Sequence, residues 1–398
     1  MSSVVAESLA EVAIVGLGIT DTGKVYGRTA GEFAADAVRL AVADAGLTLG
    51  DIDGLLISNG VSGSIDLRLQ RTLGLRDLKL LSLVTSYGAT AIAMVQQAAL
   101  AVAAGVATTV VCVHADAPLK TPDATSGSVY GAGARSADRF VGFNALAVAG
   151  GLRGPNAGYA LAARRHMDTY GTTSEQLGAI AVGQRRFAAH NPRARFRDPI
   201  TLEQHQSSRW VVEPLHLLDC CMVSNGGIAI VVTTADRATH LPQPPVHIWG
   251  SAQTHPGYPA GRGSTFGLSS GAAIAGPRAM AMAGITPADV DVCEIYDCYT
   301  FTVLITLEDY GFCAKGEGGP FVASGALAPG GSLPTNTGGG QLSSYYLWGM
   351  TPMSEAIIQT RGHGGGRQID RHDVVLVSGN GGLLDYHATM VLGSGPRP

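Results

Sequence analysis

Lysine is scarce in this sequence, because the 398 residues include only Lys24, Lys79, Lys120 and Lys315. None of the four ends a predicted core strand, which argues against a Schiff-base enzyme, since that chemistry needs a desolvated lysine. Charged residues are only 15% of the chain and the net charge is -4. The chain therefore lacks the broad basic field that attracts nucleic acids or anionic membranes. We expect a small-molecule ligand.

Metal-binding and disulfide patterns are also missing. The eleven histidines include no H-x-H or H-E-x-x-H spacing, and the six cysteines include no C-x-x-C pair, so the sequence requires neither a metal nor a disulfide scaffold. The first basic residue is Lys24, so the chain does not open with the basic region of a secretory signal. We expect reduced thiols, no metal and a cytoplasmic location.

Hydrophobic residues, by contrast, make up 46% of the chain and fall into alternating strand-like and helix-like runs. The pattern predicts a strand at 12–17, a helix at 30–45 and a strand at 54–58. The apolar stretch 88–112 is interrupted at Gln96, which favours a buried helix followed by a buried strand over a membrane span. These features indicate an α/β sheet covered by helices.

Two segments far apart in the chain repeat one pattern. Residues 45–53 read AGLTLGDID and residues 283–291 read AGITPADVD, and each segment ends a helix and enters a strand. The hydrophobic run 107–113 likewise has a counterpart at 373–377. Such internal similarity predicts two duplicated α/β halves.

The joint between the halves is predicted at residues 241–245, which read LPQPP and form a stiff connector that cannot continue a helix. We therefore predict an N-terminal half over 1–241 and a C-terminal half over 242–398. Residues 115–210 form an inserted loop and helical region that caps the site, with helical patterns at 159–170 and 173–188.

Three blocks of sequence carry a family resemblance: GATAI at 88–92, EIYDCY at 294–299 and GGQLSSYY at 339–346. Together they resemble the thiolase superfamily, particularly its lipid-transfer-protein and sterol-carrier-protein branch, over nearly the whole chain. The resemblance implies the thiolase fold, an α/β architecture in which two duplicated βαβαβ-type halves form a layered α/β/α/β/α core.

The reactive groups of a thiolase are nevertheless replaced. Thiolases carry the nucleophilic cysteine three residues before the glycine that corresponds to Gly88. In this chain that position is Thr85, and Ser86 follows it. Tyr296 stands at the histidine of the branch's His-Asp-Cys-Phe signature, and Tyr346 stands at the histidine that ends the glycine-rich segment. A thiolase needs a low-pKa thiolate and imidazoles that activate it. This chain therefore retains a thioester-binding cavity that contains phenols.

The steroid side-chain aldolases of this branch carry tyrosines at both positions. The resemblance thus implies a retro-aldol carbon–carbon lyase that acts on a β-hydroxyacyl-CoA thioester in sterol and cholesterol catabolism. The implied substrate is a steroid 17-hydroxy-20-carboxyl-CoA, and the implied products are an androstenedione-like ketone and propionyl-CoA. Coenzyme A is then part of the substrate, and no other cofactor is expected.

The resemblance also implies roles for particular residues. Tyr296 and Tyr346 exchange protons with the substrate, with the acid and base roles left open between them, and Asp297 and His387 are candidates for tuning the phenols. The enolate is held by backbone N–H groups of an oxyanion turn formed by Gly379, Asn380, Gly381 and Gly382. Thr85 and Ser86, at the position of the lost nucleophile, belong to the same thioester-binding region. Cys298, Tyr87, Tyr299 and Tyr345 are interpreted as packing residues.

Two other functions stay open. One is acyl transfer by an unusual thiolase that uses Ser86 or Thr85, and the other is a non-catalytic lipid or acyl-CoA carrier. In every case we expect a homodimer formed through the block 81–113. By resemblance, we also expect an OB-fold acyl-CoA-binding companion with a zinc-ribbon-like segment, which would complete a heterotetramer and order the Gly-, Ser- and Ala-rich stretch 124–137.

Overall fold

The predicted alternation of strands and helices is present in the computed structural model, which describes residues 2–123, 149–152, 154–256 and 265–397. The expected strand at 12–17 runs from Val12 to Ile19, and the expected helix at 30–45 runs from Ala30 to Asp44. The first elements in chain order are α1 (Ser2–Ala10), β1 (Val12–Ile19), α2 (Ala30–Asp44), η1 (Leu49–Asp51), β2 (Gly54–Ser58), α3 (Leu69–Leu73), β3 (Leu80–Leu83), η2 (Tyr87–Ala89), α4 (Thr90–Ala103) and β4 (Thr109–Asp116).

A helical region and a second set of strands follow. The region after β4 contains α7 (Gly154–Tyr170), α8 (Ser174–Ala188), α9 (Leu202–Ser207), β5 (Trp210–Val212), β6 (Leu215–His216), η5 (Leu217–Asp219), β7 (Gly226–Thr234) and α10 (Ala235–Ala238). The remaining elements are β8 (Val246–Thr254), α11 (Ala272–Ala283), η7 (Pro287–Asp289), β9 (Val292–Glu294), α12 (Thr300–Tyr310), α13 (Gly318–Ala323), α14 (Gly340–Ser343), α15 (Met350–Thr360), η8 (Gly365–Arg367), β10 (Val374–Gly381) and β11 (Tyr386–Gly393).

Nine strands join in the order β3-β2-β4-β7-β1-β8-β11-β10-β9. Within the described part of the chain, the N-terminal five strands pair with the C-terminal four only through β1 and β8, whose register covers two pairs, Ala13 with His247 and Ile14 with Val246. Parallel pairs occur at corresponding places in the two parts, between β2 and β4 and between β9 and β10. The sheet therefore consists of two strand groups with a narrow junction.

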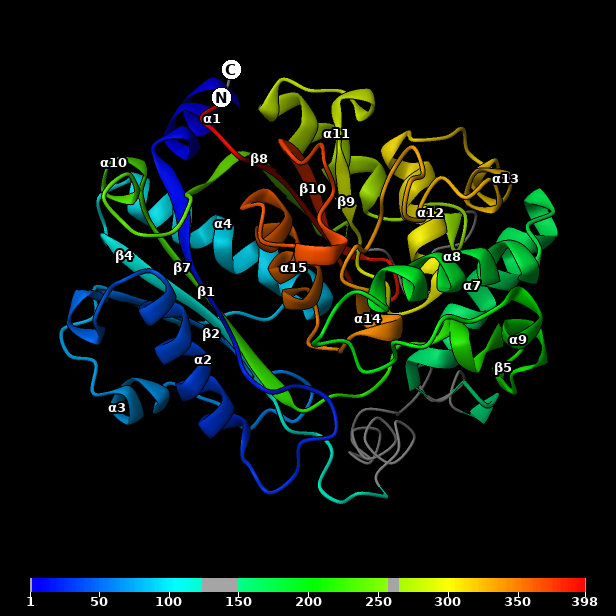
Figure 1. Ribbon diagram of the computed structural model, residues 1–398, viewed down its shortest axis with the longest axis horizontal. Helices are drawn as coiled ribbons and strands as arrows, with labels where there is room; N and C mark the ends of the chain where they lie inside the picture. The colour runs from blue at the N-terminus through cyan, green and yellow to red at the C-terminus, as the bar shows by residue number, and fades with distance from the viewer. Residues whose placement is uncertain (1, 124–148, 153, 257–264, 398) are drawn as a thin grey trace.

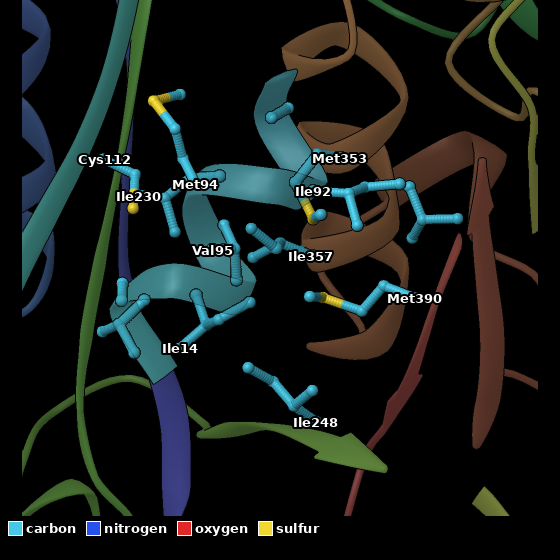
Figure 2. Packing of buried hydrophobic residues seen from close by; sticks show 14 of the residues in the cluster. Ile14, Ile92, Met94, Val95, Cys112, Ile230, Ile248, Met353, Ile357 and Met390 are labelled. Carbon is cyan, nitrogen blue, oxygen red and sulfur yellow. The ribbon is translucent and has the colours of Figure 1, made fainter. Parts of the chain in front are cut away.

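Buried hydrophobic residues form three clusters that define five layers. The central cluster includes residues of both strand groups and of helices α4 and α15, which lie between them. Figure 2 shows this packing for Ile14, Ile92, Ile248, Ile357 and Met390. A second cluster packs α2 and α3 on the outer face of the N-terminal strands, and a third packs α11 and α12 on the outer face of the C-terminal strands. This arrangement (Figure 1) confirms the predicted α/β/α/β/α core.

The internal repeat is confirmed in atomic detail. Thr48 caps η1 through Asp51, and Thr286 caps η7 through Asp289; the Oγ1–Oδ2 distance is 2.7 Å in both copies. Each 3₁₀ helix follows the end of a core helix and leads into a parallel strand, β2 or β9. The two halves thus share one local folding pattern, whereas the division at residues 241 and 242 stays a prediction.

The predicted helical patterns between the core strands are also present, as α7 and α8, which lie beside α12 and α14 in Figure 1. The stretch 124–137 lies outside the described residues. The apolar stretch 88–112 forms α4 and the first half of β4, as expected. Within the described part of the chain, no helix is long and apolar enough to cross a membrane. The cytoplasmic location stays a prediction.

Candidate active site

Gly88 lies where three distant parts of the chain meet. It is in the short helix η2, which leads into α4. A Cβ atom at this position would collide with the ring of Tyr296 and with the backbone oxygen of Asn380. Only glycine fits this close approach. The structure therefore brings the first sequence block against the second block and against the end of β10.

The two predicted phenols face each other. The hydroxyl oxygens of Tyr296 and Tyr346 are 3.0 Å apart, which is hydrogen-bonding distance. Tyr296 follows β9 and is only 4% exposed, whereas Tyr346 follows α14 and is half-buried. Fifty residues separate the two side chains in sequence, so the fold creates this pair.

Burial governs the protonation of the more enclosed phenol. Burial raises the pKa of Tyr296 well above its ordinary value, the nearby Cys298 thiol raises it further, and the hydrogen bond to Tyr346 lowers it. Tyr296 is therefore a neutral hydroxyl at neutral pH, able to donate a proton or a hydrogen bond. Burial also raises the pKa of Cys298 to about 12, so this thiol is not an activated nucleophile.

Asp297 is fully buried and follows Tyr296 in sequence, but its carboxylate contacts the backbone of α14. It accepts hydrogen bonds from the backbone N–H of Gln341 at 2.9 and 3.0 Å and from that of Leu342 at 3.4 Å. These amides belong to α14, the helix just before Tyr346. Asp297 thus connects the two tyrosine-bearing segments through the backbone.

The predicted oxyanion turn is at the end of β10. Gly382 and the next two residues adopt left-handed backbone angles between β10 and β11. A Cβ on Gly381 would lie 2.9 Å from the carbonyl oxygen of Ser86, so this turn packs directly on the loop that contains Thr85 and Ser86. Ser86 in that loop is half-buried, and Thr85 is exposed.

Asn380 contributes an additional polar group to this turn. Both polar atoms of its side-chain amide are buried, and neither has a hydrogen-bond partner within the described part of the chain. A buried amide left without partners costs free energy unless a ligand or water satisfies it. The side chain of Asn380, and not only the backbone of the turn, is therefore a candidate ligand-binding group.

His387 has a different neighbour from the one expected. Its Nε2 lies 2.8 Å from the hydroxyl oxygen of Tyr310, and that hydroxyl also lies 2.6 Å from Thr389 Oγ1. Burial lowers the pKa of His387 to about 3, so the ring is neutral. Its hydrogen bond goes to this third tyrosine on α12, and we leave His387 out of the proposed proton transfer.

Sequence reasoning missed Ser224, whose Oγ accepts the backbone N–H of Tyr346 at 3.0 Å. It also missed Tyr310 as the partner of His387. Alternation along β11 could have indicated that His387 points away from its neighbour Tyr386, but no local pattern marks Ser224. Among the described residues, no group of three or more His, Cys, Asp or Glu side chains is placed to hold a metal ion.

The five-layered core, in which the start of α4 and a glycine-rich turn meet beside paired phenols, defines a thiolase-fold protein. The Thiolase C-terminal domain-like family matches residues 252–394. A steroid side-chain-cleaving aldolase of Thermomonospora curvata is 42% identical over 379 residues, covering 93% of this chain and 95% of that protein.

Two further comparisons agree. A 17-hydroxy-3-oxo-4-pregnene-20-carboxyl-CoA lyase of Mycobacterium tuberculosis is 42% identical over 88% of this chain and 92% of that protein. A solved structure described as an Ltp2-ChsH2(DUF35) aldolase matches with a TM-score of 0.82 at 39% identity, over 96% of this chain and 98% of that one. The chain belongs to the family of steroid side-chain-cleaving aldolases, in the sterol-carrier-protein branch of the thiolase superfamily.

Proposed function

We propose that the chain is a lyase that cleaves a β-hydroxyacyl-CoA thioester by retro-aldol chemistry. The observation that carries the proposal is the 3.0 Å contact between the hydroxyls of Tyr296 and Tyr346, at the positions where a thiolase has imidazoles. The relatives at 42% identity are named for this kind of cleavage, which supports a steroid 17-hydroxy-20-carboxyl-CoA substrate. The products are then an androstenedione-like 17-ketone and propionyl-CoA.

The phenol pair can carry the reaction as a proton relay. The half-buried Tyr346 oxygen takes the proton of the β-hydroxyl and passes its own proton to Tyr296, which delivers a proton to the α-carbon. The Cα–Cβ bond breaks as the hydroxyl carbon becomes the ketone, and the bond's electron pair moves into the thioester enolate. Both phenols are neutral before and after the reaction, in keeping with the raised pKa of Tyr296.

The enolate oxygen needs hydrogen-bond donors at the opposite side of the substrate. The backbone of Asn380, Gly381 and Gly382 and the unpartnered amide of Asn380 are suited to this role, because fixed donors aimed at a developing charge need no reorganisation during the reaction. Thr85 and Ser86 border the same turn and would contact the thioester.

One incubation separates this function from its alternatives. The chain is mixed with a β-hydroxyacyl-CoA that bears a tertiary hydroxyl, and products are identified by mass spectrometry. A ketone together with a shortened acyl-CoA supports the lyase. An acyl group trapped on Ser86 or Thr85, with thiolysis by free coenzyme A, would instead support an acyltransferase. Thioester binding without turnover would support a carrier.

The Cys298→Ala variant is expected to keep most of the cleavage activity, because burial holds the pKa of this thiol at about 12 and leaves almost no thiolate at neutral pH. Steady-state rates and thermal unfolding are measured together for this variant. A folded variant without activity would contradict the phenol mechanism and return a thiol to consideration.

We also propose a homodimer. Strand β3 is at the edge of the sheet, and Leu83 at its end is 44% exposed, so the strand offers unpaired backbone groups and apolar surface to a second copy. Light scattering at micromolar concentration should give twice the chain mass of 40.8 kDa. Leu83→Lys should shift the protein toward monomer, whereas Leu40→Lys, at a 46% exposed position on α2, should not. A wild-type monomer would refute the dimer.

A companion protein completes the proposal. The description of the solved relative, Ltp2-ChsH2(DUF35) aldolase, supports a companion protein. We propose that this companion is an OB-fold acyl-CoA-binding protein with a zinc-ribbon-like segment, in a heterotetramer with the dimer. Closing the site over the thioester would exclude water and keep the substrate aligned. We expect co-expression with the companion to raise soluble yield and turnover several-fold. Equal turnover by the chain alone would refute this dependence without affecting the lyase assignment.

A further inference from the structure

Residues 219–225, here called the bridging segment, run between η5 and β7 and are fixed at both ends by buried polar side chains. Asp219 accepts hydrogen bonds from Thr300 Oγ1 at 2.6 Å and from the backbone N–H of His216 at 2.8 Å. Asn225 accepts the backbone N–H of Leu119 and donates to two backbone carbonyl oxygens, all at 2.8 to 2.9 Å. The segment is therefore held rigidly at its ends.

Between these ends, the bridging segment is hydrogen-bonded to both tyrosine-bearing parts of the chain. The backbone N–H of Cys221 donates to the carbonyl oxygen of Cys298 at 3.0 Å, two residues after Tyr296. On the other side, the N–H of Met222 donates to the carbonyl oxygen of Gln341 at 3.3 Å. The Oγ of Ser224 then accepts the backbone N–H of Tyr346 itself. One short segment thus joins the chain on either side of the phenol pair.

The backbone around Tyr346 depends on such external partners because it is not part of a long helix or strand. Asn191 Nδ2 donates to Ser344 Oγ at 3.2 Å, and the backbone N–H of Leu347 donates to Thr351 Oγ1 at 3.0 Å. At Tyr346 the N–H is satisfied by Ser224, which is only 1% exposed. Without that acceptor the N–H would be buried and unpaired, so the backbone there would move to find another partner.

The geometry points to Ser224 as a positioning residue that holds the Tyr346 hydroxyl against Tyr296. Ser224 acts through the backbone of Tyr346, and its position is set by the bridging segment that also binds the Tyr296 side. This role rests on the proposed function for its kinetic readout only, since the placement of the phenol can be observed without turnover.

The kinetic test compares three variants. Ser224→Ala should lower kcat by about 10-fold to 100-fold with little change in KM, because a small displacement of a catalytic group affects the chemical step strongly. Ser224→Thr keeps the acceptor oxygen and should recover most of the rate. Thr20→Ala is the matched control, because the Oγ1 of Thr20, directly after β1, accepts the buried N–H of Gly227 on β7 at 2.9 Å. Both residues are far from Tyr346 in sequence, and this variant should leave kcat unchanged.

Coupling to the phenol separates positioning from a general loss of structure. In a Tyr346→Phe background, Ser224→Ala should cause no further loss of rate, because the hydroxyl that Ser224 positions is already absent. A loss of the same factor in both backgrounds would overturn the inference. So would full activity of Ser224→Ala in a folded protein.

A spectroscopic measurement keeps this test independent of the proposed function. The protein is labelled with 3-fluorotyrosine, and the ¹⁹F resonance of Tyr346 is assigned from its absence in Tyr346→Phe. Ser224→Ala should shift or broaden this resonance, and Ser224→Thr should restore it. An unchanged Tyr346 resonance in Ser224→Ala overturns the positioning role. If the wild type cleaves no β-hydroxyacyl-CoA, the proposed function fails while the resonance still decides the role of Ser224.

Discussion

Replacing either phenol by phenylalanine is expected to lower the cleavage rate by about 10²–10⁴-fold, the usual contribution of a general acid or base. Tyr296→Phe and Tyr346→Phe each keep the ring and remove only the hydroxyl of a pair whose oxygens are 3.0 Å apart. The ring of Tyr296 that packs against Gly88 is retained, so the fold should be preserved. The measurements are kcat, KM and thermal unfolding with one β-hydroxyacyl-CoA substrate.

The relay also predicts how the two substitutions combine. Because each phenol needs the other, the double variant should be hardly slower than either single variant, as is usual for groups that act as a unit. Losses that multiply would indicate that the phenols act independently.

Tyr345→Phe provides the matched control for these variants. Tyr345 is the neighbour of Tyr346 and equally aromatic, but its hydroxyl lies 3.2 Å from Ser354 Oγ, away from the phenol pair. It should therefore retain near wild-type kcat. If Tyr296→Phe and Tyr346→Phe were as active as Tyr345→Phe, the phenol mechanism would be wrong.

The elements of the fold could be predicted from sequence because their signals are local. The two capped 3₁₀ helices each need a threonine followed three residues later by an aspartate, as in Thr48 and Asp51. Strand and helix runs show their periods over a few residues, so β1, α2 and β2 began at their expected residues. The repeat of one local pattern then made the two α/β halves predictable, whereas the layered core was implied by the family resemblance.

Contacts between distant residues could be predicted only where the family resemblance supplied them. The positions of Tyr296 and Tyr346 came from matching blocks of sequence, and their 3.0 Å contact depends on the packing of two separate segments. Asp297 was expected to tune a phenol, yet it binds the backbone of α14. Nothing local to Asp297 or Ser224 indicates those partners, because they come from elements that meet only in the folded chain.

Asp297→Ala is expected to lower kcat by about 100-fold, because it removes the acceptor that fixes α14 and a shift of about 1 Å in a catalytic group can cost that much. The N–H of Gln341 would be left buried without its carboxylate, which also lowers the free energy of unfolding by about 1–3 kcal/mol. Steady-state kinetics and denaturant unfolding measure the two effects. Unchanged kcat in a folded variant would show that α14 is held by other contacts.

The same carboxyl predicts a pH dependence. Burial raises the pKa of Asp297 to about 6, above the value of about 3.9 in an unfolded chain. The folded protein therefore binds this proton more tightly than the unfolded chain, so the contribution of this group to stability falls as the pH rises from about 4 to about 6. The cleavage rate should change in the opposite direction, because the ionised carboxylate is the better acceptor for the amides of α14.

The wild-type rate should thus fall as the pH drops through about 6, with the slope of a single proton. Asp297→Asn, which cannot ionise, should be slower at neutral pH and should lose this acidic limb. Asp116→Asn is the control, because Asp116 is also a buried carboxyl with a raised pKa that accepts backbone N–H groups, but its partners are Val61, Ser62 and Ala117. It should keep the limb. If the rate of Asp297→Asn still fell at acidic pH, that ionisation would belong to another group. Asp297 would then serve only to fix α14 before Tyr346.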